Sequence, residues 1–304
     1  MPASAPGLRD PAVPVRAPIR FVAGLSELAG RYDLILCDVW GVLHDGITAF
    51  PAAGEALGRF RAGGGRVVLV SNAPRPGPVV ARQLDELGVP RGAYDDIRTS
   101  GDLTRAIVEG NGARPVHHIG PERDLKLFEG LAAPFSTLDA AEYVVCTGLF
   151  DDETETVADY AETLRRMRER RLVMVCANPD LVVERGDQLI LCAGALAAAY
   201  EALGGAVLMP GKPHPPIYET ALAVGSGLLG RPALPSRTLA IGDAIRTDVA
   251  GGVAAGLDTL LVARGIHAGE LGWNGSALDR EAARSWLAGQ AATPTLIAPD
   301  LRWA

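Results

Sequence analysis

The sequence has little of what nucleic-acid binding or a structural zinc site requires. Its 304 residues carry 29 Lys and Arg against 36 Asp and Glu, a net charge of −7. Nucleic-acid binding needs a basic footprint, so no nucleic-acid partner is expected. The chain has only 4 cysteines, and because no two of them form a Cys-x-x-Cys pair, structural zinc has little support. Mainly apolar residues flank Cys37, Cys146, Cys176 and Cys192, so we expect buried, reduced thiols.

Long apolar runs are also missing. The longest one, at residues 189–200, is too short to span a bilayer, so no membrane partner is expected. The N-terminus has no cationic segment followed by an apolar run, which is the pattern of a secretory signal peptide. These features predict a soluble cytoplasmic protein.

The composition is that of a folded chain with sizeable cores. Hydrophobic residues make up 48% of the sequence and charged residues 21%, values typical of globular proteins. A length of 304 residues suggests about two domains. Residues 1–19 are rich in proline and lack a periodic pattern, so we expect an extended or disordered arm there.

Short apolar runs alternate with helical patterns along the rest of the chain. Strands are expected at residues 32–40, 66–74, 95–100, 115–120, 142–148, 172–178, 206–213, 238–244 and 259–265. Helices are expected at residues 52–64, 77–90, 102–110, 122–130, 154–171, 193–205 and 247–256, and an edge segment at 293–303. This alternation predicts an α/β fold with doubly wound parallel sheets covered on both faces.

Polar residues follow several of the apolar runs, where doubly wound sheets bind their ligands. Asp38, Asp243 and Asp248 would bring three negative charges into one crevice. Such a cluster needs a cation, because like charges raise each other's pKa, and Mg²⁺ with its preference for oxygen ligands is the natural partner. Lys212 supplies a compact positive charge suited to a phosphate oxygen, and Ser71 a neutral donor. The set favours phosphoryl transfer in which Asp38 attacks phosphorus.

Four segments carry a resemblance to a known family. The motifs "CDVWGVL", "VVLVSNAP", "GKPHPPIY" and "IGDAIRTDVAGG" occur in the order and spacing of the four motifs of the haloacid dehalogenase (HAD) superfamily. "GVLHDG" and "CANPD" resemble its subfamily IIA, the branch of sugar-phosphate, nitrophenyl-phosphate and pyridoxal-phosphate phosphatases. The resemblance runs from about residue 32 to residue 265.

The resemblance implies a two-part architecture and a substrate class. A HAD-like core would comprise residues 20–100 and 209–304, with an inserted α/β cap at residues 101–208. The substrate would be a small phosphorylated metabolite chosen by the cap. Relatives in this branch are often dimers through the cap, so a homodimer is implied here.

The resemblance also implies residue roles. Asp38 would be the nucleophile and a metal ligand, and Lys212 would neutralise Asp38 and the phosphate. Ser71, Asn72, Asn178 and Asp180 would bind the phosphate or the rest of the substrate. Mg²⁺ would be bound by the backbone carbonyl of Trp40 and by Asp243, with Asp248 in the outer shell.

Trp40 departs from the family's phosphatase pattern. Phosphatases of this superfamily have a second Asp at this position, which protonates the leaving oxygen and then activates water. General acid–base help of this kind is worth about 10²–10⁴-fold. An indole N–H does not exchange protons usefully near neutral pH, although the backbone carbonyl of Trp40 is retained.

The substitution leaves three alternatives open. The protein is a phosphatase that is slow or limited to good leaving groups, unless His44 or His214 replaces the missing acid. It is a non-catalytic protein that binds a phosphorylated metabolite. Or it is a dehalogenase-like hydrolase, because dehalogenases of this superfamily place a bulky aromatic residue here and displace halide without protonating it.

Overall fold

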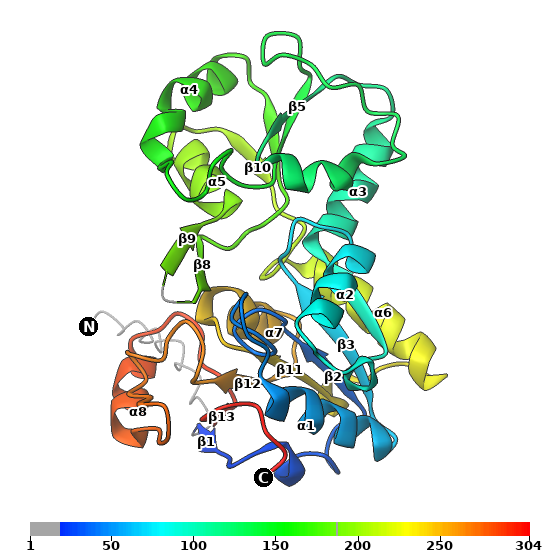
Figure 1. Cartoon of the computed structure of the whole chain (residues 1–304), viewed down its shortest axis with the longest axis vertical. Helices are drawn as coiled ribbons and strands as arrows, with labels where there is room; N and C mark the ends of the chain where they lie inside the picture. Colours follow the sequence, from blue (N-terminus) through cyan, green and yellow to red (C-terminus); the bar gives the residue numbers. More distant parts are fainter. Residues whose placement is uncertain (1–18, 187) are drawn as a thin grey trace, which may run out of the picture.

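Seven parallel strands form the larger of two α/β sheets in the computed structural model, which describes residues 19–186 and 188–304 (Figure 1). Their order across the sheet is β1 (Arg20–Phe21), β13 (Leu296–Ala298), β12 (Asp258–Val262), β11 (Thr238–Gly242), β2 (Leu34–Cys37), β3 (Arg66–Ser71) and β4 (Asp96–Thr99). The central strands are buried on both faces, as their continuous apolar runs predicted.

Helices cover both faces of this sheet because successive strand residues point to opposite sides. Ile35 of β2 packs in the cluster that contains residues of α1 (Pro51–Ala62) and α2 (Gly77–Glu86). Its neighbour Leu36 packs on the other face, against α6 (Pro215–Leu229). A π-helical turn (Ile245–Val249), α7 (Ala250–Ala254) and α8 (Arg280–Ala288) complete the core, with short 3₁₀ helices at Leu25–Glu27, Arg91–Ala93 and Pro235–Arg237.

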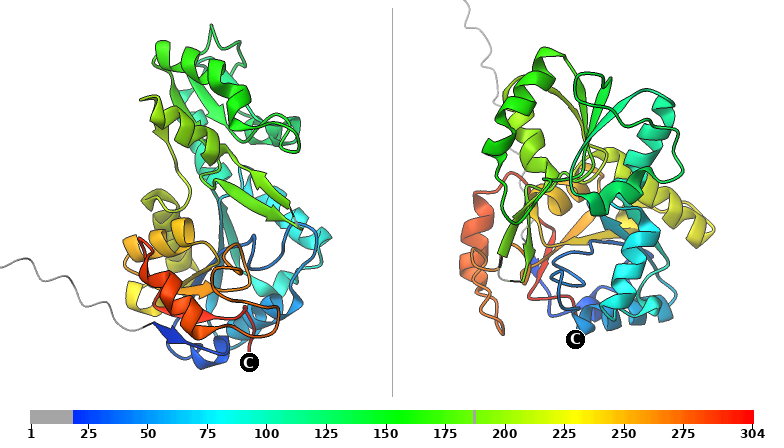
Figure 2. Two further views of the ribbon diagram at one scale, coloured as in Figure 1. Left: turned by 90° about the vertical axis from the view of Figure 1, so that its left-hand side faces the viewer. Right: turned by 45° about the horizontal axis from the view of Figure 1, so that its top comes forward.

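A second parallel sheet forms a separate upper lobe (Figure 2). Its order is β10 (Ala206–Leu208), β7 (Val173–Cys176), β6 (Tyr143–Cys146) and β5 (Val116–Ile119). Residues of α4 (Ala161–Glu169) and α5 (Ala193–Ala202) pack on one face, and residues of α3 (Ser100–Asn111) and a 3₁₀ helix (Glu122–Phe128) pack on the other. The predicted α/β class with doubly wound parallel sheets is confirmed, and every strand of the upper sheet falls within the segment 101–208 predicted as an insertion.

An antiparallel hairpin extends from the upper lobe toward the lower one (Figures 1 and 2). It consists of β8 (Val182–Arg185) and β9 (Gln188–Leu191). The sequence analysis expected no helix or strand between residues 178 and 193, so it missed this hairpin. Two runs rich in Val, Ile and Leu flank a Gly-containing turn, which is a hairpin signal.

Other expected elements differ in detail. The single helix expected at residues 154–171 is a 3₁₀ turn, Val157–Tyr160, followed by α4, because a capping box of Thr156 and Asp159 starts the helix late. The helix expected at 122–130 is 3₁₀ throughout its 7 residues. The edge segment expected at 293–303 contains β13, which is an inner strand because β1 pairs outside it.

Two further expectations concern the cysteines and the arm. All four cysteines are buried and free, as predicted. The arm predicted at residues 1–19 lies, apart from its last residue, outside the described residues. Among the described helices, none is both long and apolar enough to cross a bilayer.

Candidate active site

Three neighbouring strands of the lower sheet deliver polar side chains to one edge. β2 pairs with β11 on one side and β3 on the other, in a register that sets Cys37 opposite Ile241 and Leu69. Asp38 therefore leaves the sheet beside Asp243, while Ser71 ends β3 on the other side. Adjacent parallel strands explain why residues more than 200 positions apart share one site.

Three carboxylates meet at this edge. Asp38, Asp243 and Asp248 are buried, and each offers one oxygen within 4.8 Å of the others. A glycine makes the close approach feasible: Gly41 has φ +80°, and a Cβ there would lie 2.1 Å from Oδ2 of Asp243. The loop after Asp38 can pass this carboxylate only because residue 41 has no side chain.

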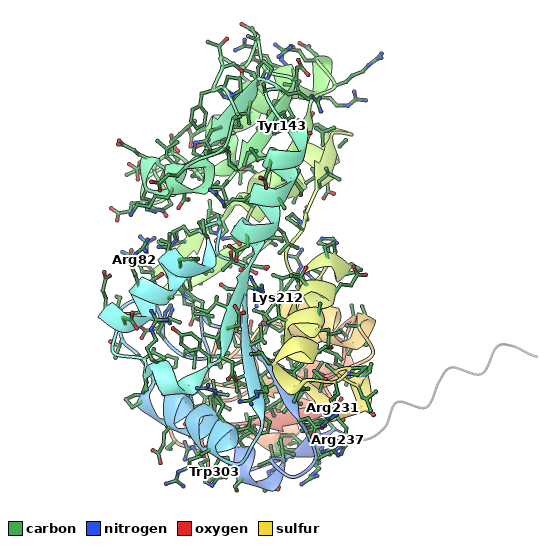
Figure 3. All side chains as sticks on the ribbon, turned by 90° about the vertical axis from the view of Figure 1, so that its right-hand side faces the viewer. Arg82, Tyr143, Lys212, Arg231, Arg237 and Trp303 are labelled. Atoms are coloured by element: carbon green, nitrogen blue, oxygen red, sulfur yellow. The ribbon has the colours of Figure 1, made fainter. Side chains whose placement is uncertain are left out.

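Lys212 balances two of these carboxylates. Its Nζ lies 2.6 Å from Oδ1 of Asp38 and 2.7 Å from Oδ1 of Asp248, and the side chain is 3% exposed. Burial works to lower the pKa of Lys212, but Asp248 and Asp38 raise it well above its usual value, so the ammonium stays charged. Figure 3 shows Lys212 at the level where the two lobes meet.

The remaining negative charge makes the cluster suitable for a cation. Burial raises the pKa of Asp38 well above its usual value, and Asp248 adds to the effect while Lys212 opposes it. Burial together with Asp248 raises the pKa of Asp243 to about 7. Carboxylate oxygens at this spacing, short of positive charge, are the donor set that a hard divalent cation such as Mg²⁺ prefers. The residues present therefore fit the predicted metal.

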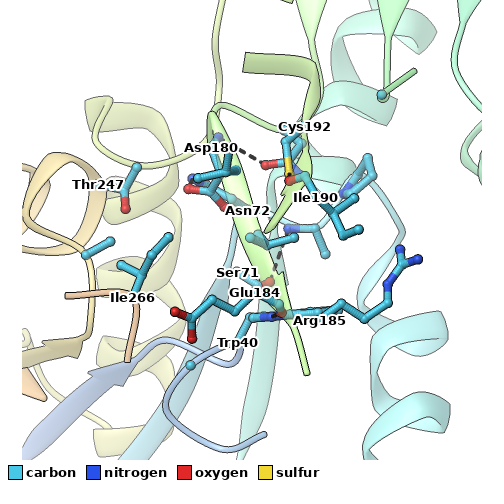
Figure 4. Close-up of a pocket in the computed structure, with 18 of the residues that line it drawn as sticks. Trp40, Ser71, Asn72, Asp180, Glu184, Arg185, Ile190, Cys192, Thr247 and Ile266 are labelled. Atoms are coloured by element: carbon cyan, nitrogen blue, oxygen red, sulfur yellow. Dashed lines mark hydrogen bonds between the residues drawn. The ribbon is translucent and has the colours of Figure 1, made fainter. Parts of the chain in front are cut away.

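Four of the predicted phosphate and substrate residues, Ser71, Asn72, Asn178 and Asp180, line one cavity between the strand ends and the hairpin (Figure 4). Lys212, also predicted to contact the phosphate, is not among the lining residues. Ser71 Oγ accepts a hydrogen bond from the Ala73 N–H at 3.1 Å, and α2 begins only at Gly77, so Ser71 does not cap that helix. Asn72 donates to Asp180 Oδ1 at 2.9 Å and accepts from the Lys212 N–H at 2.7 Å. Asn72 thus ties the lysine loop to the upper lobe.

Trp40 points its indole at the hairpin. The indole N–H donates to the backbone carbonyl of Glu184, and the ring meets His44 edge to face at a centroid distance of 5.0 Å. Figure 4 shows Trp40 and Glu184 next to each other in the cavity wall. The side chain has no acid–base group, so its contribution here is contact with the upper lobe. The predicted metal contact of its carbonyl stays a prediction.

Neither histidine considered as a replacement acid lines the described cavity. His44 is 1% exposed, and its Nδ1 accepts a hydrogen bond from the Gly46 N–H at 2.9 Å. Burial lowers the pKa of His44 to about 4, so at neutral pH its ring is the neutral imidazole and lacks the acidic proton of the imidazolium form. His214 precedes α6, and burial lowers its pKa as well.

The cavity also contains functional candidates that the sequence analysis missed. They come from the core loop after β3, from the ends of the upper strands and from the hairpin: Arg75, Arg123, Asp124, Thr147, Asp152, Glu184 and Arg185. The strand-end rule could have found Thr147, which directly follows β6, and Arg75, which lies four residues beyond β3. The strand-end rule for parallel sheets could not find the hairpin residues, because β8 and β9 form an antiparallel pair outside both parallel sheets.

The chain is similar in sequence and fold to known proteins. A family model described as haloacid dehalogenase-like hydrolase matches residues 35–132, and a HAD-hydrolase-like model matches residues 209–304. The crystal structure of a hydrolase of the haloacid dehalogenase-like family from Brucella suis 1330 is 47% identical, with a TM-score of 0.82. The match covers 92% of this chain and 99% of that one.

Two curated relatives have phosphatase names. D-glycerol 3-phosphate phosphatase of Mycobacterium tuberculosis (strain ATCC 25618 / H37Rv) is 29% identical, over 80% of this chain and 66% of the relative. Ribonucleotide monophosphatase NagD of Escherichia coli (strain K12) is 28% identical, over 76% of this chain and 88% of the relative. Both names refer to small phosphorylated molecules.

Proposed function

The chain belongs to the haloacid dehalogenase-like family of hydrolases, and from that premise we propose that it is a Mg²⁺-dependent phosphatase of a small phosphorylated metabolite. The observation that carries the proposal is the pairing of Lys212 with both Asp38 and Asp248 beside Asp243. It sets a nucleophile, a fixed positive charge and a set of metal ligands around one point. The names of the two curated relatives support the substrate class.

Asp38 is the nucleophile in this proposal. Its Oδ1 is held by Lys212 and by the Val39 N–H, whereas Oδ2 makes no hydrogen bond among the described residues. A carboxylate oxygen of Asp38 bonds to phosphorus as the ester P–O bond breaks, and the leaving oxygen takes its proton from water. Water then attacks the aspartyl-phosphate, releasing phosphate and restoring Asp38.

The other residues position the reacting groups. Asp38 and Asp243 would hold Mg²⁺ with the Trp40 carbonyl, and Asp248 would hold Lys212 in place. Bound Mg²⁺ would neutralise charge on the phosphoryl group. Ser71 and Lys212 would donate to the phosphoryl oxygens, with Asn72 fixing the lysine loop through its contact at 2.7 Å. Residues 101–208 would act as the cap that selects the substrate through Asn178, Asp180 and the hairpin, and dimerisation through that cap remains a prediction.

The lack of an acid at residue 40 limits the proposed reaction. Trp40 stands two residues after Asp38, where the phosphatases of the family have their acid, and its side chain carries no titratable proton. Esters whose leaving groups need no proton, such as aryl or acyl phosphates, should therefore react much faster than alkyl phosphates.

The direct test combines turnover with detection of the intermediate. Release of phosphate from p-nitrophenyl phosphate and acetyl phosphate would be measured with Mg²⁺ and with EDTA, for the wild type and Asp38→Asn. We expect turnover that needs Mg²⁺, loss of turnover in Asp38→Asn, and a phosphate adduct on Asp38 by mass spectrometry. Asp139→Asn is a matched control, because this carboxylate is 73% exposed and pairs only with Arg166 among the described residues. Absence of both turnover and adduct would overturn the proposal.

Binding without turnover is the second candidate function. Trp40 favours it, because its side chain contacts the hairpin and supplies no proton, while the anion-binding groups are retained. Tight binding of phosphate esters without any release of phosphate would identify this function. Halide displacement has less support, since three clustered carboxylates favour metal-dependent chemistry and halide needs no such cluster.

A further inference from the structure

Arg75 is a cavity residue that pairs with none of the residues the structure describes. It lies on the loop after Ser71, is partly buried, and lines the cavity together with Asp38. Among the described residues it makes no hydrogen bond and no ion pair. Burial lowers the pKa of its guanidinium, which means that the charge is held at a cost. A partly desolvated cation with no partner is a site for an anion.

The charged residues around Arg75 do not provide it with a paired anion. Those that act on Arg75 most strongly belong to Asp124, Arg123 and Arg185, all from the upper lobe. Arg123 and Arg185 both pair with Asp152, the latter at 3.2 Å, so that carboxylate is already shared. Arg185 also lies 3.8 Å from Glu153. The cavity wall around Arg75 therefore contains two further guanidinium groups, both paired with carboxylates of the upper lobe.

Asp124 is a weak counter-charge for Arg75. It is 3% exposed and forms no ion pair with Arg75, although it is the charge that acts on Arg75 most strongly. Burial raises the pKa of Asp124, which disfavours its charged form. Arg75 therefore lines the cavity from the core side with N–H donors that no described residue accepts.

We propose that Arg75 binds a second anionic group of the substrate, a carboxylate or a second phosphate, while the scissile phosphoryl group lies at Asp38. This inference rests on the proposed phosphatase function and narrows its substrate class to metabolites with an anion at each end. A guanidinium presents two parallel N–H donors that match both carboxylate and phosphate oxygens, which gives the site its chemical preference. Arg123 and Arg185 add positive potential from the cap as it covers the substrate.

The test uses three matched series of alkyl phosphates of increasing chain length. The far end carries a hydroxyl group in the first series, a carboxylate in the second and a phosphate in the third. The readout is the ratio of kcat/KM for each anionic compound to that of the hydroxyl compound of equal length. The second and third series separate a carboxylate site from a phosphate site.

We expect the wild type to prefer an anionic series at one or more lengths. Arg75→Met should lower that preference about 10- to 100-fold, the usual effect of losing a hydrogen bond to a charged group. Arg75→Lys should retain part of it, because charge remains without the paired donors. Arg82→Met is the matched control, since Arg82 is exposed on α2 and does not line the cavity.

Two results would overturn the inference: equal kcat/KM for anionic and hydroxyl compounds at every length, or an unchanged preference in Arg75→Met. Calorimetric Kd values of the same compounds for Asp38→Asn keep the test independent of turnover. If no ester is hydrolysed but the Kd still depends on the far anion and on Arg75, the proposed function fails and the second anion site stands.

Discussion

The indole N–H of Trp40 donates a hydrogen bond to the backbone carbonyl of Glu184, which links the loop after Asp38 to the hairpin of the upper lobe. The same two regions meet again where the Gly186 N–H donates to the Asp45 carbonyl at 3.4 Å. In the phosphatase pattern residue 40 is an acid; here it is a contact between the lobes. The side chain therefore helps to keep the hairpin over the cavity.

Trp40→Phe should loosen the hairpin while keeping an aromatic ring beside His44. The Glu184 carbonyl loses its donor, and loss of a neutral hydrogen bond costs about 0.5–1.5 kcal/mol. We expect faster amide hydrogen exchange in residues 182–191 and a KM raised about 2- to 10-fold. Trp303→Phe is the control, because Trp303 lies at the base of the lower lobe, away from the upper one (Figure 3). Unchanged exchange in the hairpin would contradict the proposed contact role.

Trp40→Asp should supply the missing acid. Relative to the wild type, we expect faster hydrolysis of alkyl phosphates, by a factor of up to about 10²–10⁴, with a much smaller change for p-nitrophenyl phosphate. Trp40→Asn is the matched control, because it has the same size as Asp and no titratable proton. If the wild type already hydrolyses alkyl and p-nitrophenyl esters at similar rates, then another group donates the proton.

The fold and the centre of the site were predictable because local sequence signals determine them. β2 and β11 are continuous apolar runs, and parallel pairing of such strands brings Asp38 and Asp243 to one edge whatever the intervening chain does. Lys212 was also identified from its place beside an apolar run, although the strand before its loop is β10 of the other sheet rather than a strand of the core.

The walls of the cavity were not predictable in the same way. Arg75 and Glu184 come from different lobes, and their approach depends on how the upper lobe sits on the core, which no local pattern specifies. The charge state of His44 likewise depends on its burial to 1% exposure rather than on its neighbours in sequence. Tertiary packing thus decided which histidines could serve as an acid.

Mg²⁺ binding should depend on pH through Asp243. In the metal-free protein burial and Asp248 raise its pKa to about 7, so part of the population is protonated at neutral pH. The metal needs the carboxylate form. As pH rises toward about 7, the Kd for Mg²⁺ should therefore decrease about tenfold per pH unit, and above about pH 7 it should become constant. Calorimetry in buffers of different ionisation enthalpy would report the released proton. A Kd independent of pH in this range would contradict the assignment.

The same shift affects the stability of the metal-free protein. A carboxyl group whose pKa is higher in the folded state binds more protons there than in the unfolded state. Its contribution to stability is present below the unfolded pKa of 3.8 and is lost as pH rises through about 7. We therefore expect the urea midpoint of the metal-free protein to fall over this range, and added Mg²⁺ to restore it at the alkaline end. Asp243→Asn should flatten both trends.

Lys212→Met should destabilise the protein strongly when metal is absent. In the native protein the Nζ of Lys212 lies 2.6 Å from Oδ1 of Asp38 and 2.7 Å from Oδ1 of Asp248. Removing this buried cation leaves the two carboxylates next to each other without their shared partner. Breaking a buried pair by deleting one partner costs about 3–5 kcal/mol. Urea denaturation at mildly alkaline pH would measure this loss, and Lys126→Met is the control, because Lys126 is exposed and is the other of the two lysines in the chain. Since protonation of the carboxylates relieves their repulsion, the difference between wild type and Lys212→Met should shrink in acid; an equal difference at all pH values would mean that lost packing, rather than charge, destabilises the variant.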